Sequence, residues 1–350
     1  MRLGSCNSYK SWSAALSYWV WINGNEPRFY EHGLYRRIHG IMLELYLIDR
    51  KVRLPMRLNW IVKYVEYLGV YPDRLHTVPI QNLTLALFFI TLFFSVSRPA
   101  EILFTNSTED ERIEIITTGL RWQDLTFHNL NKPALEQYIE FKVHWYKNQT
   151  TRGKPKIIGM QSPLCGHTHC KCASLNYIAM FQVLKQRRRA LTDALTNELR
   201  HRGSLPKQKA KQLRNLGTEP HHYIFVSEKG AVWSPSHLRK PMKQIQTVIG
   251  MRNPEAFPLY CFRIGAMSLI NQQKMDLLKA LRYVAWAIPK LPHVSARYIG
   301  FEDEELRMIP YEMVHGAIDH QGLSRDYSNT KLITFDLADA SERIFEYKTQ

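Results

Sequence analysis

The sequence predicts a mainly α-helical protein that also contains a small antiparallel sheet, an α+β fold. Over most of the chain, apolar residues recur at steps of three and four, which is the period of a helix with one buried face. Residues 112–160 depart from this pattern, because short runs of β-branched and aromatic residues alternate there as they do in strands. The chain has 350 residues, of which 45% are hydrophobic and 22% charged, so it can fold into two domains of ordinary size.

Residues 1–76 are expected to form a small helical domain. The helical pattern runs through 33–48 and 57–70, and Pro55 separates the two segments. Lys and Arg fall on the outer faces of these predicted helices. We therefore predict three parts: an N-terminal helical domain over 1–76, a main domain over 77–318 and a C-terminal tail over 319–350.

Pro79 is expected to open a long buried helix that continues to about Phe104. Its most apolar stretch, 83–96, has 14 residues, fewer than the roughly 20 that a membrane-spanning helix needs. Polar and charged residues follow at once in the stretch 97–101. We therefore expect a buried helix and no membrane partner.

The predicted sheet consists of short segments and ends in a hairpin. Its strands are expected within 113–120, 124–130, 137–146 and 155–160. The turn of the last hairpin, 147–154, is polar and rich in cations. The rest is predicted to be mostly helical, with helices over about 172–190, from Ser234 onward, over 259–301 with breaks, and over 336–347.

Lysine and arginine outnumber aspartate and glutamate, 47 against 31, which gives a net charge of +16. This excess favours a polyanionic partner, either nucleic acid or an acidic membrane surface, although a merely basic protein has the same composition. Ten lysines and arginines fall within 185–214, where a solvated helix or a loose basic loop would also account for them. The candidates for contacts with DNA are Arg187, Arg188 and Arg189 in this run and Arg152 in the hairpin turn.

The five cysteines are an odd number, and the first residues lack the apolar core of a secretory signal. Free thiols in a reducing, intracellular compartment are therefore expected. This compartment would be the nucleus in a eukaryote, since the stretch 185–189 has the composition of a nuclear address. In a prokaryotic or viral setting it would be the cytoplasm or nucleoid.

One short stretch combines the ligand types that zinc prefers: Cys165, His167, His169, Cys170 and Cys172. Their spacing is tighter than in common zinc-finger patterns, and one tetrahedral site does not easily take ligands so close in the chain. A cysteine-rich loop before a helix is the alternative. A zinc ion would tie the sheet to the helix that starts near residue 173. Apart from this candidate structural zinc, the sequence predicts no cofactor.

Two pairs of polar residues share a helix face. Arg98 and Glu101 are three residues apart, and so are Tyr260 and Arg263, which precede an apolar run. Taken singly, the first pair fits an ordinary helix ion pair and the second a cation–π contact. A lone tyrosine further along, Tyr298, fits a packed core residue.

The order of these features carries more information than each one alone. Arg-x-x-Glu is followed by a small sheet with a lysine-bearing hairpin, then by Tyr-x-x-Arg-Ile-Gly-Ala, by Trp286 at 23 residues after Arg263, and by Tyr298. This order resembles the tyrosine recombinase family, which includes phage integrases, Cre recombinase and the recombinases of Crypton and DIRS-type mobile elements. The resemblance covers about residues 80–300, and the hairpin turn is most similar to that of the mobile-element members. A helical DNA-clamp domain would fit residues 1–76.

The resemblance implies roles for the two arginines, for Glu101 and for a lysine of the hairpin turn. Arg98 and Arg263 would hold the non-bridging oxygens of the scissile phosphate, and Glu101 would orient Arg98. Lys147 in the hairpin turn, with Lys154 as the alternative, would protonate the leaving 5′ oxygen. Arginine suits phosphate binding because its guanidinium is planar and stays charged at all relevant pH values. A lysine on a hairpin can supply the proton to the leaving oxygen.

The resemblance also assigns the aromatic residues. Trp286 falls where the family has a His or Trp beside the phosphate, and Tyr298 falls at the nucleophile. A phenol has a pKa near 10, so nearby cations are needed to favour the phenolate. Tyr260 stands where the family more often has a histidine, and it cannot shuttle protons near neutral pH. Tyr298 follows Trp286 at a spacing of 12 residues, about three more than the family pattern, and a proline-stiffened loop would account for the difference.

The expected function is therefore site-specific recombination or integration of DNA through a covalent 3′-phosphotyrosine, without metal or ATP. The partners would be double-stranded DNA and further copies in a homotetramer on paired sites, with no small-molecule substrate. The alternatives are a non-catalytic DNA-binding protein derived from such an enzyme and a type IB topoisomerase-like strand transferase. An RNA-binding factor has only the charge in its favour.

Overall fold

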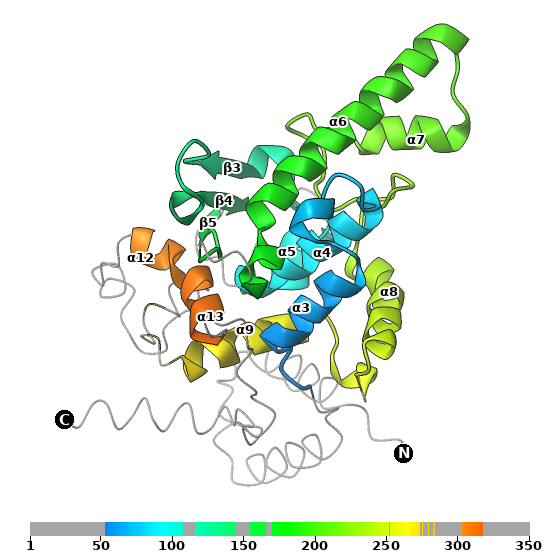
Figure 1. Cartoon of the computed structure of the whole chain (residues 1–350). Coiled ribbons are helices and arrows are strands. Elements are labelled where there is room, and N and C mark those ends of the chain that lie inside the picture. The colour runs from blue at the N-terminus through cyan, green and yellow to red at the C-terminus, as the bar shows by residue number, and fades with distance from the viewer. Residues whose placement is uncertain are drawn as a thin grey trace, which may run out of the picture. The chain divides into compact units, whose positions relative to one another are not determined.

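The computed structural model describes residues 53–107, 116–144, 155–165, 170–251, 253–273, 275, 279, 283 and 303–317 (Figure 1). The chain divides into two compact units, Met1–Arg53 and Leu54–Gln350. Apart from Arg53, all described residues belong to the second unit. The division precedes the predicted domain boundary at residue 76, because the helix that follows Leu54 packs into the core of the second unit.

The centre of the second unit is the helix α4, Ile80–Phe94, which is buried on all sides from Leu83 onward. Three helices pack against α4. They are α3, Leu58–Tyr67, α6, Tyr177–Arg202, and α9, Tyr260–Gln272. Phe89 of α4 stacks on Phe262 of α9, with the ring centroids 5.4 Å apart. A helix that is apolar around its whole circumference must be surrounded, so its sequence accounts for its central place.

α4 ends at Phe94 and not near Phe104, which corrects the prediction of one long helix. Val96 has a φ of +50°, in the left-handed region that β-branched residues avoid, and the chain leaves the helix there. Arg98 is extended, with φ −77° and ψ 147°, as a residue before proline prefers. A separate short helix, α5, Pro99–Ile102, then begins with its proline in the first position.

The predicted small antiparallel sheet is confirmed. It has three strands in the order β3, β4, β5, which span Leu125–His128, Tyr138–Val143 and Lys156–Gln161. Side chains alternate along β4, so that Phe141 and Val143 are buried while Lys142 between them is exposed. A separate two-stranded ribbon pairs β1, Asn106–Ser107, with β2, Ile116–Thr117.

The basic run at 185–214 forms two helices and not a loose loop. α6 begins after Asn176, whose side chain accepts the Ala179 N–H at 3.2 Å, and it continues past the predicted end at 190 to Arg202. Gly203 terminates it with a φ of +71°. α7, Lys207–Asn215, then contacts α6, and the two helices form an arm that extends from the rest of the unit (Figure 1).

Shorter elements complete the unit. Ser234 caps α8 as the sequence predicts, and α12 and α13 pack against β5. The bounds are Pro235–Val248 for α8, Asp303–Arg307 for α12 and Ile309–Ala317 for α13. Single turns of 3-10 helix are η2 Pro72–Arg74, η3 Trp122–Asp124, η4 Ala134–Glu136, η5 Lys171–Leu175 and η6 Pro254–Ala256.

The described residues are thus mainly helical with one small three-stranded antiparallel sheet and a two-stranded ribbon, which confirms the predicted fold class. No helix within the described ranges is long and apolar enough to cross a membrane. The break after α4 is the feature that matters most for function, because the first arginine of the predicted set follows it directly.

Candidate functional site

Arg98 is held in place by Glu101 from within its own short helix. One carboxylate oxygen of Glu101 accepts the backbone N–H of Arg98 at 3.0 Å, and the other accepts the Arg98 Nη1 at 2.8 Å. The side chain of Glu101 is 2% exposed and that of Arg98 is 23% exposed. The buried carboxylate therefore fixes the guanidinium while part of it stays accessible, as the predicted pairing requires.

Arg263 comes from α9 and meets the same turn. It is 2% exposed, and its Nη1 donates to the carbonyl oxygen of Val96 at 2.8 Å. Burial, and after it the positive charge of Arg98, lower the pKa of Arg263 to about 10, while Glu101 and Tyr260 oppose the effect. Arg263 therefore stays charged at neutral pH, and its electrostatic coupling to Arg98 and Glu101 puts the predicted pair of arginines in one place.

Gly265, two residues after Arg263, explains the small residue in the Arg-Ile-Gly-Ala stretch. A side chain there would overlap the backbone of Met56, because α9 lies directly against that segment. The Met56 N–H donates to the carbonyl oxygen of Cys261 at 3.0 Å, which ties the segment to the start of α9. The glycine thus permits the close packing that positions Arg263.

A third cation, Lys156, joins the two arginines from the sheet. It is the first residue of β5, pairs with Val143 of β4 and is 8% exposed. Its Nζ has no hydrogen-bond partner among the described residues. Burial lowers the pKa of Lys156 to about 7. Glu101 acts against this lowering, whereas the charges of Arg263 and Arg98 add to it.

The sequence does not point to Lys156, because the resemblance places the lysine in the polar turn over 147–154. Lys147 and Lys154 both lie outside the described residues, so they stay predictions. A signal for Lys156 was available, because it shares the buried face of its strand with Ile158 and Met160 at steps of two. A lysine on the core face of a strand is unusual enough to single out.

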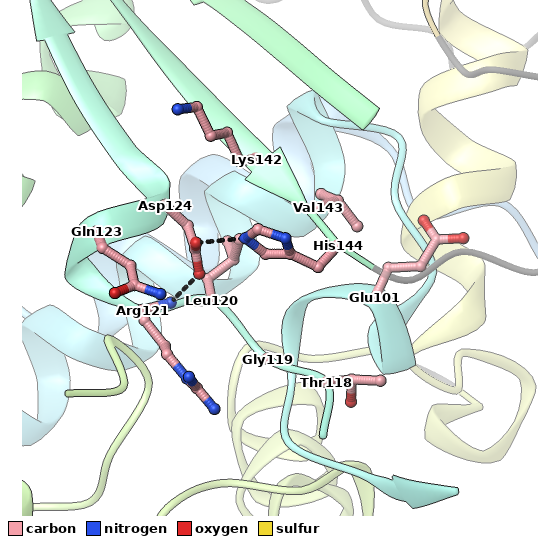
Figure 2. A pocket seen from close by; sticks show the side chains of 10 residues that line it. All are labelled: Glu101, Thr118, Gly119, Leu120, Arg121, Gln123, Asp124, Lys142, Val143 and His144. Atoms are coloured by element: carbon pink, nitrogen blue, oxygen red, sulfur yellow. Dashed lines mark hydrogen bonds and ion pairs between the residues drawn. The ribbon is translucent and has the colours of Figure 1, made fainter. Parts of the chain in front are cut away.

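A pocket of about 160 Å³ lies beside this cluster, between α5 and the end of β4 (Figure 2). Glu101 lines one side of it, and Lys142, Val143 and His144 line another. His144 Nε2 lies 2.7 Å from an oxygen of Asp124, whose side chain is 3% exposed, while that of His144 is 58% exposed. The second Asp124 oxygen accepts the backbone N–H of Arg121 at 2.9 Å. The pocket therefore presents an imidazole that a buried carboxylate orients, which the sequence did not reveal.

The structure describes Tyr260, which is one of the predicted aromatic residues, and Tyr283, which precedes Trp286 in the chain. Tyr260, the first residue of α9, is 36% exposed and interacts electrostatically with Arg263. Tyr283 is buried, and its hydroxyl donates to the carbonyl oxygen of Phe94 at 2.7 Å. This bond ties the chain shortly before Trp286 to the end of α4. Trp286 and Tyr298 themselves lie outside the described residues.

The arginines of α6 that were predicted to contact DNA differ in exposure to solvent. Arg188 is fully buried, and its guanidinium donates to the carbonyl oxygens of Tyr223 and Val226 at 3.2 and 3.3 Å. Burial lowers its pKa to about 9. This corrects the prediction for Arg188, because a guanidinium enclosed by its own protein cannot reach a phosphate.

The two neighbours of Arg188 are more accessible. Arg187 is half-buried and donates to the carbonyl oxygens of Leu75, at 3.2 Å, and Val78. Arg189 is exposed and remains a candidate for DNA contact. Arg152 lies outside the described residues.

Three of the predicted zinc ligands lie together. The sulfur atoms of Cys165, Cys170 and Cys172 are all within 4.8 Å of one another. His167 and His169 lie outside the described residues. The structure therefore brings together three cysteines whose close spacing in the sequence argued against a single metal site.

Comparisons of the sequence with models of protein families and with curated proteins find no match. Among solved structures, the chain is similar to a site-specific recombinase, XerH, in a pre-cleavage complex with its difH substrate. The identity is 15% and the TM-score 0.38, over 73% of this chain and 52% of that one. The chain thus matches about half the length of that protein. A likeness this distant carries no argument about activity, which has to come from the residues themselves.

Proposed function

We propose that the chain is a tyrosine recombinase-type enzyme that breaks and rejoins DNA strands. The observation that carries this proposal is the coupling of Arg98, Arg263 and Lys156, three cations from separate parts of the chain, around the single carboxylate of Glu101. Burying more positive than negative charge is costly unless an anion compensates it. A phosphodiester is an anion with the geometry to accept from two guanidinium groups at once.

In this proposal the two arginines stabilise the charge that develops on the non-bridging oxygens. Donors that are already in place cost no reorganisation during the reaction, and Glu101 together with the Val96 carbonyl holds them. Lys156 acts as the general acid that protonates the leaving 5′ oxygen. A pKa of about 7 supports this role, because an efficient acid has a pKa near the operating pH. Lys156 thus takes the place first expected for Lys147 or Lys154.

Tyr298 serves as the nucleophile in this proposal. Its phenolate attacks the phosphorus, a bond forms between the phenolic oxygen and phosphorus, and the 5′ oxygen leaves with the proton from Lys156. The 3′-phosphotyrosine keeps a phosphodiester linkage, so the reverse attack by a 5′ hydroxyl rejoins strands without ATP. Trp286 packs beside the phosphate, and Tyr260 donates a hydrogen bond to it.

Double-stranded DNA is the proposed partner, and the net charge of +16 supports it. We further propose that the chain acts as a homotetramer on paired sites, with the tail over 319–350 contacting a neighbouring copy. Size-exclusion chromatography of DNA complexes, with the full chain and with a chain that ends at residue 318, tests the tail. An assembly unchanged by the truncation would remove that part of the proposal.

Covalent capture on DNA tests the central proposal. A library of nicked duplexes with random sequence is labelled at the 5′ end of the strand that would join the protein. The short leaving strand diffuses away, so cleaved complexes accumulate as adducts that survive denaturation. We expect an adduct with the wild-type chain and none with Tyr298→Phe, which should still bind DNA. Tyr67→Phe is the matched control, because Tyr67 is an exposed tyrosine in α3, and it should form the adduct normally.

The other outcomes identify the alternatives. An adduct that persists in Tyr298→Phe would refute the assignment of the nucleophile. Sequence-selective binding without any adduct in the wild type would instead indicate a non-catalytic DNA-binding protein. Relaxation of supercoiled DNA by a monomer would indicate a type IB topoisomerase-like strand transferase.

A further inference from the structure

Three cysteines lie close together in the segment that follows β5. Cys165 follows the strand, Cys170 is the N-cap of η5, and Cys172 lies within η5. The Sγ atoms of Cys165 and Cys172 are 3.4 Å apart, and all three sulfurs lie within 4.8 Å of one another. Cys170 and Cys172 are buried, at 5% and 1% exposure, and Cys165 is half-buried.

The separations fit a shared metal ion. Zinc binds thiolate sulfur at about 2.3 Å, so two sulfurs at a tetrahedral angle lie roughly 3.8 Å apart. The observed spacing brackets this value. The sequence objection that Cys170 and Cys172 stand too close in the chain is removed by the backbone. Cys170 is extended, with φ −73° and ψ 136°, before the 3-10 turn begins, and this lets both sulfurs point to one place.

The surroundings also suit a metal thiolate. The backbone N–H of Cys172 donates to the Cys170 sulfur at 3.5 Å, the kind of contact that supports a metal-bound thiolate. From α13, His315 Nε2 lies 2.9 Å from the carbonyl oxygen of Pro163, two residues before Cys165. The cysteine group therefore lies where the exit of β5, the start of α6 and α13 meet.

We propose that Cys165, Cys170 and Cys172 bind a structural zinc ion that joins the end of β5 to the start of α6. Sites of this class take four protein ligands. Three of the four are these cysteines. The proposal does not rest on the proposed DNA chemistry, because the cysteines follow β5 whereas Lys156 starts it.

Metal analysis of the full chain tests the proposal. The protein is purified under reducing conditions without chelator, and zinc is measured by elemental analysis and native mass spectrometry. About one zinc ion per chain is expected. Replacement by Co²⁺ should give the thiolate charge-transfer and intense d–d absorption of a tetrahedral cobalt site. Removal of zinc with a strong chelator should lower the Tm, and added Zn²⁺ should restore it.

Variants locate the site. Cys172→Ser should lose the zinc, whereas Cys261→Ser should keep it, since Cys261 is a buried cysteine of α9 outside the group. If Cys172→Ser does not fold, the cobalt spectrum of the wild type and Cys165→His, which keeps a ligand at that position, provide the same test.

Three results would overturn the proposal. The first is a full chain that contains no zinc and gains none when Zn²⁺ is added. The second is zinc that Cys172→Ser retains in full. The third is a mass and a thiol count that show a disulfide within the group in the protein as isolated under reducing conditions.

Discussion

Replacing Lys156 with alanine tests the chemical assignment that differs most from the sequence-based expectation. The Nζ of Lys156 is buried beside Arg98, Arg263 and Glu101, and its pKa of about 7 lies close to neutral pH. A positioned general acid contributes roughly 10²–10⁴-fold to a rate. Lys156→Ala should therefore slow adduct formation by about that factor and leave DNA binding nearly unchanged.

The leaving group reveals whether the lost function is proton donation. In a duplex with a bridging 5′ sulfur at the scissile position, the leaving thiolate needs no proton, because a thiol is far more acidic than an alcohol. Single-turnover rates of adduct formation are measured on this duplex and on the normal one. With the sulfur duplex, Lys156→Ala should approach the wild-type rate. Arg263→Ala should stay slow on both, since its role is to stabilise charge on the non-bridging oxygens.

Other lysines supply the controls. Lys132→Ala removes an exposed lysine between β3 and β4 and should leave the rate within about threefold of the wild type, the size of effect that the loss of one surface charge produces. Lys147→Ala and Lys154→Ala test the positions first expected for the acid. If Lys156→Ala cleaves at the wild-type rate while Lys147→Ala is slow and regains its rate with sulfur, Lys147 is the acid and the reasoning from burial is refuted.

The pH dependence gives an independent check of the same group. A general acid must be protonated, so kcat/KM should fall as the pH rises through about 7, the pKa of Lys156 in the free protein. Lys156→Ala should lack this limb of the profile. A bound phosphodiester adds a negative charge nearby, which raises the pKa of Lys156, so the same limb should lie at higher pH for the bound complex. A profile that is flat in the wild type would contradict the assignment.

Four further predictions concern stability. Lys156 has a folded pKa of about 7, below its unfolded value near 10.4, so the unfolded chain binds more protons between these values and the unfolding free energy should rise with pH there. Lys156→Met should remove this slope and raise the unfolding free energy at pH 7 by about 1–4 kcal/mol in urea titrations; an unchanged slope would contradict the burial. Arg188→Met should cost about 1–3 kcal/mol, because two buried carbonyl groups lose their donor, and should not alter the salt dependence of DNA binding. Arg189→Ala should change the unfolding free energy by less than about 0.5 kcal/mol. It should reduce the slope of log binding constant against log salt concentration by about 1, which filter binding at several salt concentrations would measure. Gly265→Ala should lower the unfolding free energy by about 1–3 kcal/mol, because the added methyl group overlaps the Met56 backbone, and a neutral effect would show that α9 can move away.

Local patterns predicted most of the elements but not the end of α4. The strands β3 to β5 were found because a period of two is written in neighbouring residues. The apolar run over 83–96 continues past Phe94, so hydrophobicity gave no sign that Val96 would adopt a left-handed conformation. Pro99 was the available signal, since proline prefers the first turn of a new helix. The break needs tertiary contacts, among them the bond from Arg263 to the Val96 carbonyl, which no local pattern contains.

The sequence predicts the site residues that belong to the Arg-x-x-Glu and Tyr-x-x-Arg motifs, but it does not point to Lys156. Arg98 and Glu101 form the expected pair, and Arg263 is electrostatically coupled to them. Lys156 and Arg188 were misjudged for the same reason, because a charged residue was assumed to face solvent or DNA. Both lie on the apolar face of their element: Lys156 shares the buried face of β5, and Arg188 follows Leu184 at the helical step of four. Trp286 and Tyr298 stay predictions, since they lie outside the described residues.

The balance of charge in the site links the low pKa of Lys156 to the proposed reaction. With Lys156 neutral, the two arginines and Glu101 leave one net positive charge, which matches the single negative charge of a phosphodiester. Attack by a phenolate brings a second negative charge, and a protonated Lys156 raises the site to two positive charges, so the balance closes at the transition state. Transfer of the proton to the leaving oxygen then returns Lys156 to the neutral form. A lysine with an ordinary pKa near 10.4 would be a weaker acid and would give its proton to the leaving oxygen less readily. The burial that lowers the stability of the free protein is therefore the same property that would make Lys156 an effective acid in the proposed reaction.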